Sequence, residues 1–124
     1  MLAFSWYLST LPFGLDEAKS VNLTQANLAD ANFFQANLSE VILEQANLQQ
    51  ANLSQANLQQ AQLKGANLKD ANLKNANLKN ANLENANLQG ADLRKANLEG
   101  INFKNAIIDQ TTLWSERQNN DYVP

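Results

Sequence analysis

The chain has 124 residues and a formal net charge of −3, and it contains neither cysteine nor histidine. Disulfides, thiol nucleophiles, the common zinc and haem ligands and the usual general base are therefore excluded. A single domain of this length encloses a large core only if a repeating pattern supplies it.

The first twenty residues are rich in apolar and aromatic side chains and stand outside the repeat that follows. Residues 1–15 contain no Lys or Arg and no Ala-x-Ala cleavage site, and they are shorter than a membrane-spanning helix of ~20 residues. We expect residues 1–20 to form a cap over the first unit of the repeat, because an open solenoid end exposes strand edges and apolar side chains. The alternative is a signal peptide or a remnant of one.

From Val21 to Leu113, an apolar residue recurs at every fifth position without insertion or deletion. Leu, Phe or Ile holds this position, and Ala, Val or Ile stands two places earlier, except at Thr111. The commonest unit is Ala-Asn-Leu followed by two polar residues. A fixed period is typical of repeat architectures, and the strict register argues against disorder although Asn and Gln are abundant.

The five-residue period fits neither a helix nor a continuous strand. Five residues turn an α-helix by about 500°, so the leucines would spread around the axis. A strand alternates with a period of two. The period instead predicts an extended triplet with its first and third side chains pointing inward, followed by a two-residue corner.

Charges predict the number of repeats in each coil, because residues one coil apart lie about 4.8 Å from each other. At a spacing of 20 residues, one charged pair repels, Lys74/Arg94, and four attract: Glu44/Lys64, Lys64/Glu84, Glu84/Lys104 and Lys79/Glu99. At spacings of 15 and 25, two pairs attract and three repel. The pairing therefore favours four repeats per coil.

The Ala-Asn/Asp-Leu-x-x pattern from Val21 to Asp109 resembles the pentapeptide-repeat family, and it continues less regularly to Leu113. The resemblance implies an all-β fold, a right-handed quadrilateral β-helix of about four to five coils. We expect an N-terminal cap at residues 1–20, the β-helix at 21–115, with Trp114 shielding the last coil, and a C-terminal tail at 116–124.

Outward positions carry the candidate functional residues. We expect Asn37, Asn57, Asn77 and Asn97 to stack as amide ladders, which is a structural role. Four lysines, Lys64, Lys69, Lys74 and Lys79, fall on four different sides, so they form a belt and we do not expect nucleic-acid binding. Phe34 and Ile42 are apolar where solvent is expected. They are covered by the N-terminal segment or form a candidate interaction patch.

No residue indicates a catalytic, cofactor or metal site, so we do not expect an enzyme, a cofactor or a small-molecule substrate. Some members of the family mimic DNA and bind DNA gyrase, so a mimic that binds gyrase or another DNA-binding protein is the alternative function. Duplex DNA carries one charge per ~1.7 Å, and a rod of ~20 Å would need roughly a dozen negative charges. Residues 21–115 have eight acidic and seven basic side chains, a net charge of −1.

We therefore expect a non-enzymatic structural or protein-interaction module with an unidentified protein partner, like many small cyanobacterial members of the family. We expect no membrane span, and either a monomer or an end-to-end dimer. The expected location is the cytoplasm; a signal peptide in residues 1–15 would instead indicate export or the thylakoid lumen.

Overall fold

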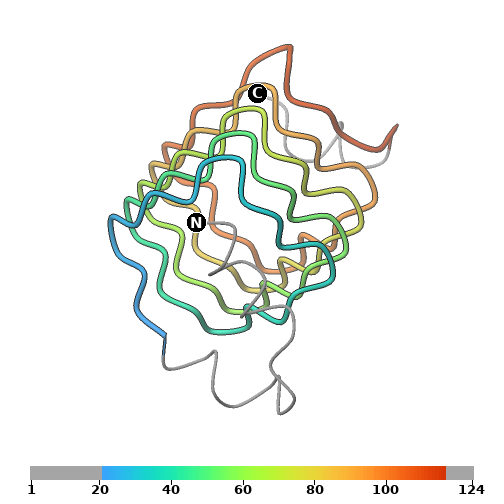
Figure 1. Ribbon diagram of the computed structural model, residues 1–124. Coiled ribbons are helices and arrows are strands. Elements are labelled where there is room, and N and C mark those ends of the chain that lie inside the picture. The colour runs from blue at the N-terminus through green and yellow to red at the C-terminus, as the bar shows by residue number, and fades with distance from the viewer. Residues whose placement is uncertain (1–20, 117–124) are drawn as a thin grey trace.

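The computed structural model describes residues 21–116, which wind into a stack of four-sided coils (Figure 1). Parallel β-bridges join residues twenty positions apart, from Asn22 with Ile42 to Asn87 with Ile107. Each side contributes one bridging residue per coil, so the contacts are single bridges and not long strands. The predicted four repeats per coil are confirmed.

We number the four sides in chain order by their bridging residues. Side 1 holds residues 22, 42, 62, 82 and 102, side 2 holds 27, 47, 67, 87 and 107, side 3 holds 32, 52, 72, 92 and 113, and side 4 holds 37, 57, 77 and 97. A corner is named by the two sides it joins.

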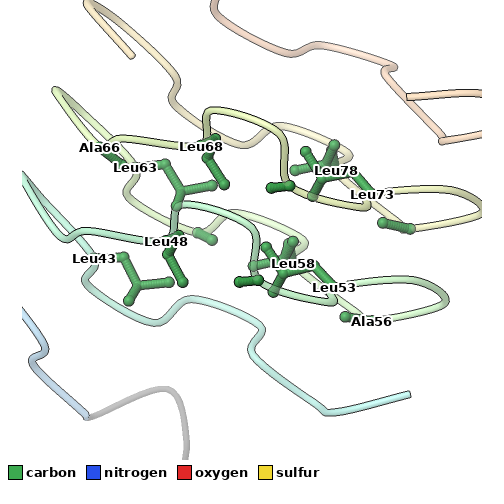
Figure 2. Close-up of a cluster of buried hydrophobic side chains, with 14 of the residues drawn as sticks. Leu43, Leu48, Leu53, Ala56, Leu58, Leu63, Ala66, Leu68, Leu73 and Leu78 are labelled. Carbon is green, nitrogen blue, oxygen red and sulfur yellow. The ribbon is translucent and has the colours of Figure 1, made fainter. Parts of the chain in front are cut away.

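Alanine and leucine side chains fill the axis of the coil. Every inward apolar residue from Leu28 to Leu98 is buried. Figure 2 shows Leu43 to Leu58 of one coil packed beneath Leu63 to Leu78 of the next. The inward residues at the two ends of the described stack are only partly buried: Val21, Leu23 and Ala26 at the start, and Ile101, Phe103, Ala106 and Ile108 at the end. Each coil therefore depends on its neighbours for burial, as in other solenoids.

The corners are tight turns with one residue in the left-handed region. At the corner after Leu48, the Ala51 N–H donates to the Leu48 carbonyl at 3.0 Å. Gln50, the second corner residue, has a φ of 59°, which together with this hydrogen bond indicates a type II turn. A positive φ is costly for a residue with a Cβ. The Gln50 N–H donates to the Lys69 carbonyl of the next coil at 2.9 Å, and this bond helps to hold the conformation.

At two of these corner positions, glycine also leaves room for a side chain of the coil below. A Cβ on Gly90 would lie 2.0 Å from Oδ1 of Asp70, and a Cβ on Gly100 would lie 2.0 Å from Oδ1 of Asn80. The side chain of the coil below therefore occupies the space that a larger residue would need.

The last corner contradicts the strict five-residue period. Asp92 pairs with Leu113, a spacing of 21 residues, so the corner between Ile108 and Thr112 holds three residues in place of two. The Thr112 N–H closes this corner on the Asp109 carbonyl at 3.1 Å. The Asp109 carboxylate also accepts the Thr111 N–H at 2.8 Å.

The inserted residue exchanges which side chains point inward. Thr112 is buried and its hydroxyl donates to the Leu88 carbonyl at 2.8 Å. Leu113 is 44% exposed, so the prediction that it points inward is wrong. Trp114 instead packs on the core and meets the Phe103 ring edge-on, with the ring centroids 5.9 Å apart. Its predicted role in shielding the last coil is confirmed.

The predicted N-terminal cap, residues 1–20, and all of the predicted tail beyond Glu116 lie outside the described residues. Within residues 21–116, no helix is long and apolar enough to span a bilayer.

Candidate interaction surface

Side 4 carries a continuous ladder of asparagine amides. The Nδ2 atom of each asparagine donates to Oδ1 of the one in the coil below, with distances of 3.3 Å for Asn57 to Asn37, 3.2 Å for Asn77 to Asn57 and 3.2 Å for Asn97 to Asn77. Oδ1 of Asn77 also accepts the backbone N–H of Lys79 at 3.2 Å. The predicted ladder is confirmed, and these amide groups bind one another and the turn that follows them.

Charged side chains at two corners pair between coils. Lys64 meets Glu84 at 3.7 Å and Lys79 meets Glu99 at 3.2 Å, so two of the four predicted attractive pairs form salt bridges. The other two pairs, Glu44/Lys64 and Glu84/Lys104, form none among the described residues. Both of these pairs share a residue with the Lys64–Glu84 salt bridge, which already engages Lys64 and Glu84.

The four lysines of the third coil lie one at each corner, as the belt predicts. The bridging residues Gln62, Asn67, Asn72 and Asn77 stand on sides 1 to 4, and each lysine follows one of them by two positions. Positive charge therefore encircles the coil and is not gathered on one side.

The corner between sides 3 and 4 differs from the others because like charges adjoin there. Arg94 lies one coil above Lys74 and turns away to Asp92, with Nε 2.9 Å from Oδ1 and Nη2 2.7 Å from Oδ2. The hydrogen bonds from Arg94 are the largest cause that lowers the pKa of Asp92, and the charges of Arg94 and Lys74 lower it further. Lys95 follows Arg94 at the same corner and is exposed.

Phe34 and Ile42 do not lie on the same side of the molecule. Phe34 is 42% exposed at the corner between sides 3 and 4. Ile42 is half-buried in the middle of side 1, between Asn22 and Gln62. Side 4 separates the two residues, so the structure does not bring them together into one flat patch.

Two further apolar side chains are exposed in the last coil. Ile107 is 50% exposed on side 2, and Leu113 is exposed on side 3, across the corner that begins at Asp109. Ile107 could have been found from the sequence, because it occupies the outward position usually held by asparagine. Leu113 could not, because the inserted corner residue changes its direction.

Among residues 21–116, no group of three or more acidic, His or Cys side chains is arranged to hold a metal ion. The described surface thus consists of the amide ladders, the paired charges, one corner where positive charges adjoin and a few exposed apolar residues.

Stacked four-sided coils with an Ala and Leu interior define the protein as an all-β solenoid of five-residue repeats. The chain belongs to the pentapeptide-repeat family, because a family model described as "Pentapeptide repeat region" matches residues 36–113. No curated protein matches it.

Solved pentapeptide-repeat structures share this right-handed β-helix. Rfr23 from the cyanobacterium Cyanothece 51142 is 54% identical, with a TM-score of 0.78, over 85% of this chain and 71% of that protein. A pentapeptide repeat protein of the Arabidopsis thaliana thylakoid lumen is 29% identical, with a TM-score of 0.69, over 77% and 67% of the two chains. One from the cyanobacterium Nostoc is 32% identical, with a TM-score of 0.59, over 94% and 87%.

Proposed function

We propose that the protein is a non-enzymatic interaction module, in which a rigid β-helix presents exposed corner residues to a protein partner. The observation that carries the proposal is Phe34, a large aromatic side chain that is 42% exposed at a corner where later coils carry Ser54, Lys74 and Arg94. Exposed aromatic residues on an otherwise polar surface are typical of contact sites.

The arrangement of the interior supports a role without catalysis. The inward positions from Leu28 to Leu98 are apolar and buried, so polar chemistry is confined to the outside of the coil. The amides of side 4 are bonded to one another, and the charges of Lys64 and Lys79 are paired with glutamates. These groups stabilise the stack, which leaves recognition to the residues that are not engaged in this way.

Partner capture from native lysate tests the proposal. Wild-type protein is compared with Phe34→Ser and with Ile42→Asn as separate variants, because the two residues lie on different sides. We expect Phe34→Ser to lose a specific partner and to keep the wild-type melting temperature. A melting temperature that falls while the partner is retained would mean that Phe34 is a structural residue and would contradict the proposal.

The charge distribution does not favour a DNA mimic. Residues 21–116 carry nine acidic and seven basic side chains, a net charge of 7 − 9 = −2. A mimic of this height needs roughly a dozen negative charges, and here a belt of lysines surrounds the third coil. We expect no effect of micromolar protein in a gyrase supercoiling assay; inhibition or protection of gyrase would show that this interpretation is wrong.

A further inference from the structure

Among residues 21–116, the corner between sides 3 and 4 is the one corner whose charged residues sum to a positive charge. The corner between sides 1 and 2 alternates in sign along the axis, with Glu44, Lys64, Glu84 and Lys104 in successive coils. Lys79 and Glu99 pair at the corner between sides 4 and 1. In contrast, the corner between sides 3 and 4 holds Lys74, Arg94 and Lys95.

The register places these cations close together. Asn72 bridges to Asp92, so Lys74 and Arg94 leave the same corner of adjacent coils, about 4.8 Å apart along the axis. Asp92 neutralises Arg94. Lys74 and Lys95 have no salt-bridge partner within residues 21–116, although Glu116 is also found near this end of the corner. With Asp92 and Glu116 counted, the three cations leave a local net charge of 3 − 2 = +1.

Folding does not require this like-charge arrangement. The same corner position holds Ser54 in the second coil, and other corners place glutamates there. Adjacent like charges on an exposed surface oppose folding slightly. A locally unfavourable choice in an otherwise regular repeat indicates a functional constraint.

Phe34 lies on the same corner as these cations. Its neighbour Asn32 is joined through Asn52 and Asn72 to Asp92 by successive bridges, so Phe34 lies two coils below Lys74 and three below Arg94. These separations are about 10 and 14 Å along the axis. An extended peptide covers them with about three and four residues.

We propose that this corner, from Phe34 to Lys74, Arg94 and Lys95, binds an extended acidic segment of a partner protein. The segment places an apolar side chain against Phe34 and, four residues further on and on the same face of the extended chain, a carboxylate against the cations. This inference rests on the proposed interaction function and identifies the chemistry of the partner. A local net charge of +1 is small for a nucleic-acid site, where affinity depends on many phosphate contacts.

The test is a titration of the ¹⁵N-labelled full chain, followed by its amide chemical shifts. The probe is a synthetic peptide that contains Phe-Ser-Ser-Glu-Glu between Gly-Ser ends. We expect saturable shifts at Phe34, Lys74 and Lys95 that weaken with added salt. Comparable shifts at Lys69, which lies in the same coil at another corner, would mean nonspecific attraction to lysine and would overturn the proposal.

Matched variants distinguish binding at this corner from nonspecific attraction to any exposed lysine. Lys74→Glu and Lys95→Glu are each expected to weaken peptide binding about fivefold or more, whereas Lys69→Glu changes it less than twofold. Lys74→Glu removes the repulsion from Arg94, so its melting temperature should equal or exceed that of the wild type, which shows that the variant is folded. Equal losses in the Lys74 and Lys69 variants would contradict the proposal.

A single-stranded oligothymidine serves as the competing probe. Shifts at the corner that are larger with oligothymidine than with the peptide would overturn the assignment of an acidic protein segment. If the peptide fails to bind while Phe34→Ser still loses its lysate partner, the interaction function stands and only the acidic-segment inference fails.

Discussion

Replacement of Leu73 by alanine probes the inward leucine columns at the middle of the stack. Leu73 is 0% exposed and lies between Leu53 and Leu93 in its column. Its coil is held on both sides, because the Asn72 N–H donates to the Ala51 carbonyl at 2.9 Å and the Leu73 N–H donates to the Asp92 carbonyl at 2.8 Å. Neighbouring coils therefore cannot move in to fill the cavity.

A buried Leu→Ala substitution costs 2–5 kcal/mol, and the cost rises when the site cannot collapse. We expect Leu73→Ala to lower the free energy of unfolding by about 3–5 kcal/mol. The measurement is urea unfolding followed by far-ultraviolet circular dichroism. We expect the slope of the unfolding free energy against urea concentration to stay unchanged.

Leu113→Ala is the matched control, because it removes the same atoms from an exposed position. We expect a change within about 0.5 kcal/mol. Trp114→Ala should cost more, about 2 kcal/mol, because Trp114 packs on the core and against Phe103. A strict five-residue period would instead place Leu113 inward and Trp114 outward. It therefore predicts a larger loss of stability for Leu113→Ala than for Trp114→Ala. A loss of under 1 kcal/mol for Leu73→Ala, or equal losses for Leu73 and Leu113, would refute this reasoning.

Three further predictions concern the corners and the ends. Deletion of Gln110 leaves a two-residue corner like the others and keeps Trp114 inward, so we expect the urea midpoint to change little, whereas deletion of Asn77 from a triplet should lower it strongly. The pKa of Asp92 is lowered chiefly by its hydrogen bonds with Arg94, so its stabilising effect is present above the ordinary carboxyl pKa of about 3.9 and is lost as pH falls through the lowered value. Asp92→Asn should therefore reduce stability at neutral pH more than in strong acid, and an equal reduction at both would contradict this. Deletion of residues 1–15, which form most of the predicted cap at residues 1–20, should promote end-to-end association in light scattering; a monomer after deletion would mean that the cap prediction is wrong.

The coil could be predicted because one short pattern repeats and because its charges favour twenty residues per coil, whereas the right-handed, four-sided section is implied by the resemblance to the pentapeptide-repeat family. A coil of twenty residues places Lys64 beside Glu84 and Lys79 beside Glu99, and both pairs form salt bridges. The separation of Phe34 from Ile42 also follows from this spacing, since a whole side lies between them.

The reversal of the last coil could not be predicted. Leu113 falls in phase with the repeat, and an apolar side chain in phase gives no sign that an extra corner residue precedes it. Two neighbours favour an outward Leu113. Thr112 can be buried because its hydroxyl donates a hydrogen bond to the Leu88 carbonyl, and Trp114 covers more apolar surface than a leucine would. The choice of salt-bridge partner at Lys64 likewise depends on side-chain geometry that the sequence does not contain.

A pair of engineered cysteines tests the four-repeat coil most directly. The chain has no native cysteine. Asn57 and Asn77 bridge on side 4, and their Cα atoms should lie about 4.8 Å apart, within the range that a disulfide spans. We predict that Asn57→Cys with Asn77→Cys forms an intramolecular disulfide on mild oxidation, read by mass spectrometry, while Asn57→Cys with Asn72→Cys or with Asn82→Cys keeps free thiols. Rapid cross-linking of either of those two pairs, or none in the first, would contradict a coil of twenty residues.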